Sequence, residues 1–546
     1  MSRLHSYSES DVNFYYVDDN AKKANPQKVD TFDKLITHLK KAIQDRRHEE
    51  LYLVRGILVW IAQSQSHSGR EARYNTPLFY IQQLVERRIS PAEVFKIFCG
   101  YAGIECEQVT GRAKAIRYRA GDSDSEYLKH HTWIAFKAGG KWHLMHPQWS
   151  IQAFVGYEHG GEIEIEKDGR EKIKVRTEKQ GRPMFMVNDF WFCTAPEIFV
   201  TRCFPDDIKW QNPDGNVFVN TVNDFLALPD LRQGFYDMKL CLLIEEKSCV
   251  LHSKNGKCYV SVMTEKDGAK AIDFSYELAM EGTSGDDLKP KDMKQLVLHQ
   301  ICGKERNIIK FEIRLPVVGT YWFRLAVGLV HEPDKKRNCC EFKILCKEAC
   351  KDCRRFPMCA GLGAYGYGPQ AEEAGLVNSS QTDAKINMKP NKGKSKQTIA
   401  TFKTENDPET DMSYAAQIIK SGSDEVDGDS IDIILEGTTE VVHDKKQGKL
   451  TVNANVPKDG EYALVVTAKD LKDKKNKKEK PVAGYLVTTH EDEDDKRTNA
   501  QIKQQERKVR CENHKVAKIE ERNRLVDIID STRMEIDSLK VSGKRK

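Results

Sequence analysis

The spacing of apolar residues along the chain predicts helices first and strands afterwards. Between about residues 30 and 110, apolar residues recur three and four positions apart, as in "FDKLITHLKKAI" at 32–43. The stretch 51–62, "LYLVRGILVWIA", is apolar nearly all round, which predicts a buried helix. A further helix is predicted to begin at Pro91, since proline is favoured in a first helical turn, and to end near Gly100.

From about residue 104 to residue 200 the apolar residues alternate with polar ones, which predicts strands. Helices followed by an antiparallel sheet make an α+β domain. We assign residues 29–232 to this domain and residues 1–28 to an N-terminal tail. The predicted strands are "IECEQVTGRAKAIRY", "HTWIAFKAGGKWHLMH" and "DFWFCT".

After residue 230 the chain is almost wholly strand-like and contains one internal repeat. Two segments share an alternating strand followed by Pro-x-x-Gly-x-Tyr. A tyrosine that opens a strand after a tight turn is typical of the tyrosine corner of an immunoglobulin-like sandwich. We predict a first sandwich over 233–355, and a glycine-rich linker with a second sandwich over 356–489. The matched residues are Pro316, Gly319 and Tyr321 in the first segment, and Pro457, Gly460 and Tyr462 in the second.

Residues 490–546 combine a charged run with an amphipathic helical pattern. This C-terminal helix could pair with another helix and so cause oligomerisation, or it could pack on the rest of the chain or remain solvated. The pattern lacks the three or four heptads of a clear coiled coil, so these three alternatives stay open. The stripe contains Val516, Ile519, Val526, Ile529 and Ile536.

Composition limits the classes of partner only weakly. The chain has 87 basic and 82 acidic residues, a formal net charge of +5 that favours neither nucleic acid nor a membrane surface. The basic stretches at 470–481 and 542–546 lack interleaved aromatic residues, so we expect no nucleic-acid partner. No secretory signal is visible in residues 1–28, and no apolar run approaches the roughly 20 residues needed to cross a bilayer. Fifteen cysteines, an odd number, fit reduced thiols, so we expect a cytoplasmic protein without membrane insertion.

The candidate chemistry lies in a predicted hairpin at 130–150, "HHTWIAFKAGGKWHLMHPQWS". It places His131 at the start of one strand and His146 at the end of the next, beside three tryptophans. Histidines on adjacent strands under aromatic cover are typical of a hydrolytic site, in which the imidazole activates a nucleophile.

This hairpin, together with "RGILVWIA" and "AGIECEQVTGRAKAIRYRAG", resembles a transglutaminase-like domain. The following "FWFCTAPEIFVTRCFPDDIKWQ" and the two sandwiches narrow the resemblance to the kyphoscoliosis peptidase and hillarin group, over roughly residues 30 to 490. The resemblance implies an α+β papain-like transglutaminase core, followed by two all-β immunoglobulin-like sandwiches and a C-terminal helix. Enzymes with this core use a Cys-His-Asp triad.

The resemblance also assigns positions to the triad, and two of its three members differ here. His131 occupies the histidine position, but His146 stands where the motif has aspartate, and Arg88 stands where it has cysteine. A two-residue deletion would bring Ser90 to the cysteine position, where we expect a helix N-cap instead. Cys99, the first cysteine, lies about 16 Å further along the same helix and is expected to be a core thiol.

We therefore predict a catalytically inactive scaffold. The resemblance implies cytoskeletal association through filamin-like or septin-like partners. The alternative is an active peptidase or transamidase with an unorthodox nucleophile, either Ser90 or a cysteine from another domain. We expect no cofactor and no metal; zinc could be held only by His131, His143 and His146 with a cysteine, or by the cluster Cys346, Cys350, Cys353 and Cys359.

Overall fold

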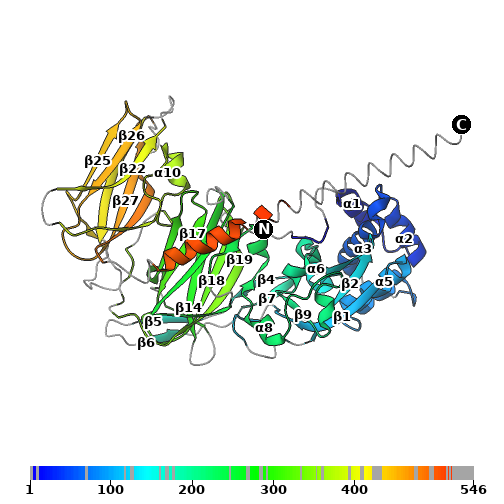
Figure 1. The fold of residues 1–546 in the computed structure, drawn as a ribbon. Coiled ribbons are helices and arrows are strands. Elements are labelled where there is room, and N and C mark those ends of the chain that lie inside the picture. Colours follow the sequence, from blue (N-terminus) through cyan, green and yellow to red (C-terminus); the bar gives the residue numbers. More distant parts are fainter. Residues whose placement is uncertain are drawn as a thin grey trace.

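The computed structural model divides into three parts along the chain (Figure 1). Blue helices with a cyan sheet lie at one end, a green β-sandwich lies in the middle, and a yellow and orange β-sandwich lies at the other end. The structure describes the chain except for residues 1–3, 8–11, 68–71, 116–117, 123–127, 129, 159–160, 166–170, 175–178, 245–247, 266–270, 282–286, 291–292, 333–334, 352, 354, 358–361, 392–394, 406–410, 421–432, 473–477, 491–496, 512–513, 516–517 and 519–546.

The helical layer follows the predicted pattern closely. The helix over 49–64 is buried on almost every side, as its apolar sequence predicts. The hydroxyl groups of Thr31, Thr76 and Ser90 accept backbone N–H groups of the helices that follow them, so these helices begin at their sequence caps. The helices of this layer are α1 (Tyr15–Lys23), α2 (Phe32–Lys40), α3 (Glu49–Ser64), α4 (Pro77–Val85) and α5 (Pro91–Ala102).

A five-stranded sheet packs against this layer, in the order β8-β3-β2-β1-β9. Gly139 and Gly140 both have positive φ and form the turn between β2 and β3. Alternation along β2 divides its side chains between two cores: Ile134 faces the helices, and Trp133 faces the opposite side. The strands are β1 (Cys106–Ala113), β2 (His130–Ala138), β3 (Lys141–Met145), β8 (Phe192–Thr194) and β9 (Cys203–Pro205).

The described part of residues 1–28 packs on the domain, which differs from the N-terminal tail that the sequence predicts. Val17 and Ala21, four residues apart on α1, are buried against the helical layer. The segment before α1 lies along β8 as an additional extended stretch, with Ala195 N–H donating to Leu4 O (2.9 Å) and Ser6 N–H donating to Cys193 O (2.7 Å). The N-terminal segment therefore covers an edge of the sheet.

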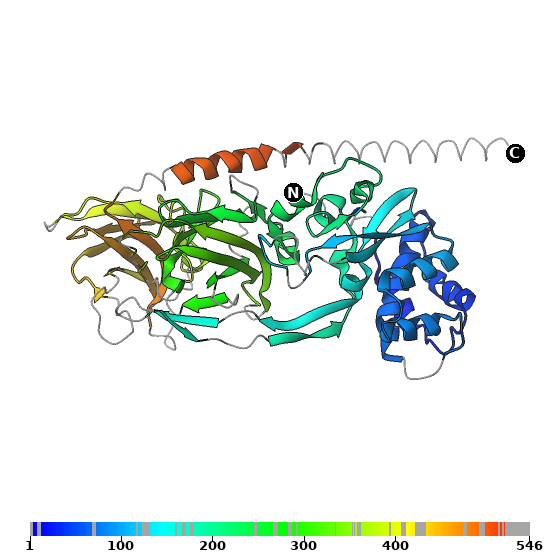
Figure 2. The same cartoon turned by 90° about the horizontal axis from the view of Figure 1, so that it is seen from below.

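The first sandwich has one sheet in the order β11-β13-β17-β16 and a larger one in the order β10-β19-β18-β14-β15-β5-β6. Three strands of the larger sheet come from before residue 233, so the predicted boundary at 232/233 does not separate two independent sheets. Figure 2 shows strands running from the helical end toward the sandwich as an arm. The strands of the sandwich are β5 (Gly161–Ile165), β6 (Glu171–Lys174), β10 (Asp230–Leu231), β11 (Cys241–Leu242), β12 (Val250–His252), β13 (Lys257–Met263), β14 (Ile272–Glu281), β15 (Asp287–Pro290), β16 (Val297–Cys302), β17 (Ile308–Arg314), β18 (Gly319–Leu329) and β19 (Arg337–Cys346). β4 (Gln152–Glu158) and β7 (Lys179–Phe185) pair with each other in a separate two-stranded sheet.

The second sandwich has sheets in the orders β20-β22-β26-β25 and β21-β28-β27-β23-β24. Its core is formed by the inward-facing residues of both sheets, as in other two-layer β-domains. The elements are α10 (Pro369–Glu373), β20 (Leu376–Val377), β21 (Lys385–Asn387), β22 (Gln397–Thr404), β23 (Met412–Lys420), β24 (Ile433–Ile434), β25 (Thr439–Asp444), β26 (Lys449–Ala454), β27 (Glu461–Asp470) and β28 (Lys480–Thr488).

Both sandwiches contain the predicted tyrosine corner. The Tyr321 hydroxyl donates to Val317 O (2.7 Å), and the Tyr462 hydroxyl donates to Lys458 O (2.9 Å). Both side chains are almost completely buried. The repeat seen in the sequence is therefore a repeat of the same side-chain-to-backbone bond across a turn.

Replacing either corner tyrosine with phenylalanine is expected to lower the free energy of unfolding by about 1 kcal/mol, because the hydrogen bond from the side chain to the backbone across the turn is lost. Thermal unfolding of Tyr321→Phe and Tyr462→Phe measures the effect. Tyr15→Phe is the matched control, since Tyr15 is 71% exposed and should show no change. Corner variants as stable as this control would contradict the assignment.

The segment around Tyr365, between the two sandwiches, packs against both of them. Tyr365 N–H donates to His299 O (2.8 Å), and Ile301 N–H donates to Tyr365 O (2.7 Å). Gly366 forms a β-bridge with Gly484 of the second sandwich. The predicted linker is thus a strand-like segment held between the two sandwiches.

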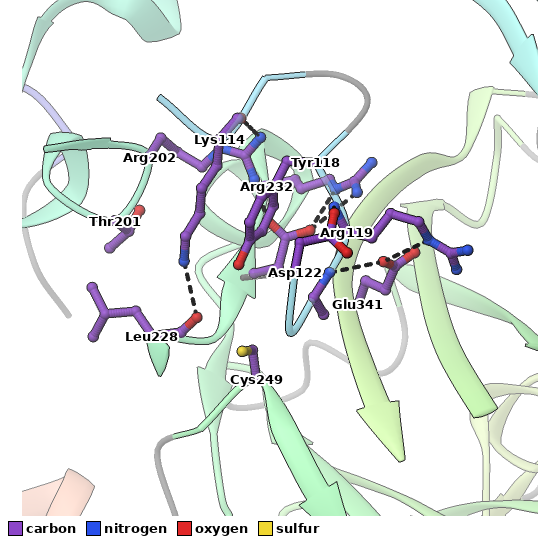
Figure 3. Close-up of polar contacts among 12 residues, drawn as sticks. Lys114, Tyr118, Arg119, Asp122, Thr201, Arg202, Leu228, Arg232, Cys249 and Glu341 are labelled. Carbon is purple, nitrogen blue, oxygen red and sulfur yellow. Dashed lines mark hydrogen bonds and ion pairs between the residues drawn. The ribbon is translucent and has the colours of Figure 1, made fainter. Parts of the chain in front are cut away.

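The helical layer and its five-stranded sheet, together called the N-terminal unit, meet the first sandwich at a buried ion cluster (Figure 3). Asp230 is fully buried on β10 and accepts hydrogen bonds from Arg202 and, at 3.0 to 3.1 Å, from Arg232. Burial raises the pKa of this carboxyl, yet the surrounding cations hold the pKa below its ordinary value. The buried Lys114 ammonium donates to Leu228 O (3.1 Å) in the same cluster.

A second carboxylate completes this joint from the sandwich side. Glu341, on β19, is buried and accepts hydrogen bonds from Arg324 and from Ala120 N–H (3.2 Å). The Arg119 guanidinium lies 3.9 Å from the ring centroid of Trp322. The loop after β1 is therefore fixed to the sandwich by charge and by stacking.

Candidate functional site

The two candidate histidines lie together in a cluster of aromatic rings on the hairpin. The rings of His146 and Trp149 stack at 3.8 Å with an interplanar angle of 8°. The His131 ring lies 5.9 Å from each of these two rings, measured between centroids. His146 also lies 6.4 Å from Trp133, and Trp191 packs on Trp149 at 4.6 Å.

His146 acts as the N-cap of α6 (Pro147–Ile151). Its Nδ1 accepts the backbone N–H of Trp149 (3.3 Å), which requires the proton of the neutral ring to be on Nε2. Nε2 is buried without a hydrogen-bond partner among the described residues. Burial first, and the nearby His131 second, hold the pKa of His146 well below its ordinary value. His146 is thus a neutral ring that carries no negative charge.

His131 is half-buried, and its contacts with the described residues are aromatic. Burial lowers the pKa of His131, so the neutral imidazole is favoured. By the alternation of β2, His131 shares the sheet face of Trp133, opposite the face covered by α5. Within the described ranges no hydrogen bond joins His131 to a serine or cysteine side chain.

The candidate nucleophile positions precede α5, which runs antiparallel to β1. Lys96 of α5 pairs with Glu107 of β1 (2.8 Å), so the helix N-terminus lies toward the end of the sheet where Gly111 pairs with His131. Arg88 is 68% exposed and pairs with Glu86 at 3.1 Å. The described contacts of Arg88 do not include His131.

Ser90 and Cys99 have the structural roles that the sequence predicts. The Ser90 hydroxyl caps α5 by accepting Glu93 N–H at 3.2 Å. Cys99 is fully buried in the helical core, and its hydrogen bond with Cys106 and its burial raise the pKa of the thiol. A buried thiol with a raised pKa is a poor nucleophile.

The zinc alternatives do not gather ligands in the described part of the chain. There, no group of three His, Cys, Asp or Glu side chains is arranged to hold a metal. His143 lies on the helix-facing side of β3, stacked on Phe136, and is therefore separated from His131 and His146 by the sheet. Of the cysteine cluster, residue 359 lies outside the described residues.

One polar contact of the hairpin could not be predicted from the sequence. The Ser6 hydroxyl and His143 Nδ1 lie 2.7 Å apart, although 137 residues separate them. His143 Nε2 lies 3.4 Å from Ala138 O, which places the proton on Nε2 and makes Nδ1 the acceptor. Only the extended course of the N-terminal segment along β8 brings this pair together.

Comparison with known proteins agrees with this architecture. Residues 222–357 match the family model of the KY-like, immunoglobulin-like domain. The chain is 23% identical to Lim and transglutaminase domain protein ltd-1 of Caenorhabditis elegans, over 71% of this chain and 51% of that protein. It is 24% identical to hillarin of Drosophila melanogaster, over 80% of this chain and 50% of that protein. It is 26% identical to kyphoscoliosis peptidase of Mus musculus, over 57% of this chain and 43% of that protein.

These matches define an α+β protein that carries immunoglobulin-like sandwiches, as the sequence predicts. These relatives support the resemblance to the kyphoscoliosis peptidase and hillarin group that the sequence shows. It spans about half the length of the curated relatives it matches. In the described residues, no helix combines the length and the apolar character needed to cross a bilayer.

Proposed function

We propose that the chain is a catalytically inactive scaffold that binds cytoskeletal proteins in the cytoplasm. The observation that carries the proposal is the state of His146. A triad carboxylate accepts the proton of its histidine and stabilises the charged imidazole. A buried, neutral His146 that stacks on Trp149 cannot do either. The exposed Arg88 at the cysteine position supports the same conclusion, since a guanidinium is no nucleophile.

Protein binding is supported by the strands that end the sheets of the second sandwich, among the described residues. β24 and β25 each end a sheet, and an extended peptide can add to such an edge through backbone hydrogen bonds. The side chains of Ile433, Ile434 and Val442 on these strands are 47%, 52% and 50% exposed, so an added strand would find apolar contacts. Filamin-like or septin-like proteins are the proposed partners, from the resemblance to the family.

The purified chain is expected to show no turnover that depends on His131. Incorporation of a fluorescent amine into a glutamine-containing protein tests transamidation, and cleavage of labelled peptides tests hydrolysis. Wild type, His131→Ala and the control His443→Ala should all give background rates. Turnover that His131→Ala abolishes and His443→Ala retains would establish the alternative, an active enzyme with an unorthodox nucleophile.

A further inference from the structure

Residues 497–511 form a helix that lies across the first sandwich, drawn in orange in Figures 1 and 2. Polar contacts near its two ends hold it over the sheet of β11, β13, β17 and β16. Lys310 Nζ donates to Asn499 Oδ1 (2.9 Å), and the Arg510 guanidinium donates to Glu305 (2.8 Å). The helix is therefore attached near both of its ends.

The apolar attachment between these contacts is small. Ile502 is 7% exposed and packs in a cluster with Leu243, Met263 and Ile308. Val509, seven residues further along the helix, is partly buried against the same cluster. Burial of a single aliphatic side chain shifts an equilibrium by roughly tenfold to a hundredfold. Such a contact is strong enough to hold the helix and weak enough to release it.

The helix and the sheet also fit imperfectly. A cavity of about 200 Å³ lies between them. Its sandwich side has an apolar part formed by Leu243, Ile244 and Leu251, beside the polar side chains of His252, Lys254 and Lys257. Its helix side is polar apart from Ile502, because Gln501 and Gln505 face the same space. Apolar side chains at these two helix positions would fill the cavity and bury more apolar surface.

We propose that helix 497–511 is a displaceable strap, and that the groove beneath it binds an amphipathic helix of a partner protein. The chemistry of the groove defines that partner. The partner helix carries aliphatic side chains at the positions that correspond to Gln501, Ile502 and Gln505. It also carries a cation at the position that corresponds to Arg510, opposite Glu305. The unfilled cavity favours such a helix over the strap. This inference does not depend on the loss of catalysis.

A labelled peptide tests the groove in the 546-residue chain. The peptide has the sequence of residues 497–511, with leucine at 501 and 505 and serine at 511. Ile502→Asp releases the strap and is expected to bind the peptide at least tenfold more tightly than wild type. The chain with Gln501→Leu and Gln505→Leu tightens the strap and should bind it at least tenfold more weakly. Gln504→Leu, on the exposed face of the helix, is the control and should match wild type.

Two further measurements make the proposal refutable. Adding Met263→Asp to the Ile502→Asp chain should abolish peptide binding, while thermal unfolding confirms that the sandwich stays folded. In wild type, amide hydrogens of 497–511 should exchange well before those of β13 and β17. The proposal would be overturned if the amide hydrogens of the helix and of the strands exchanged equally slowly. It would also be overturned if neither Ile502→Asp nor Met263→Asp changed the affinity for the peptide.

Discussion

Replacing Asp230 with asparagine is expected to lower the free energy of unfolding by about 3 to 5 kcal/mol. The carboxyl is fully buried and bonded to Arg202 and Arg232, with Lys114 in the same cluster. A neutral amide of the same size removes the carboxylate that Arg202, Arg232 and Lys114 share at a buried joint. The same variant should loosen the contact between the N-terminal unit and the first sandwich.

Urea unfolding followed by tryptophan fluorescence measures this loss. Asp207→Asn is the matched control, because Asp207 pairs with Lys209 at 2.9 Å while both side chains are more than half exposed. The control should change stability by less than about 1 kcal/mol. Since the folded-state pKa of Asp230 is lowered, its contribution should persist above the ordinary carboxyl pKa and disappear as the pH falls through the lowered value. An Asp230 variant as stable as the control would contradict the role of the cluster.

The second large effect concerns Lys114 and depends on pH. Burial lowers the pKa of this ammonium from 10.5 to about 8. Between these two values the unfolded chain binds more protons than the folded chain, so the folded state gains stability as the pH rises. The gain is about 3 kcal/mol when the whole window from pH 7 to pH 10.5 is crossed.

Lys114→Met removes the titrating group. Comparing this variant with wild type therefore separates the titration of Lys114 from that of the other groups. The difference in free energy of unfolding between wild type and Lys114→Met should therefore shift in favour of wild type by about 3 kcal/mol over that window. Urea unfolding at several pH values gives the difference. Lys209→Met, whose side chain is 67% exposed, should show no such shift. A difference that is constant with pH would show that Lys114 is not held as described.

Local features of the fold were predictable from the sequence, because their causes are local. Ser90 and Pro91 predict the start of α5, and the repeated Pro-x-x-Gly-x-Tyr pattern predicts both tyrosine corners. The positions of His131 on β2 and of His146 directly after β3 also follow from the alternation of the hairpin. The two rings do lie side by side.

Features that join distant parts of the chain were not predictable. Asp230 and Glu341 are ordinary acidic residues in the sequence, and only the pairing of β10 with β19 buries them among arginines. Likewise, nothing in residues 1–28 indicates that Ser6 reaches His143, because apolar periodicity carries no information on which sheet edge a segment covers. Strand β5 joins the sandwich for the same reason, through a partner far along the chain.

The packed segment around Tyr365 has a mechanical consequence. Arg314 of the first sandwich also forms a two-pronged ion pair with Glu461 of the second, at 2.6 and 2.7 Å. Together with the β-bridge between Gly366 and Gly484, this ion pair ties the two sandwiches at separate points, so that they form a stiff spacer. Two ligands bound to the two sandwiches would therefore be held at a fixed separation and in a fixed relative orientation.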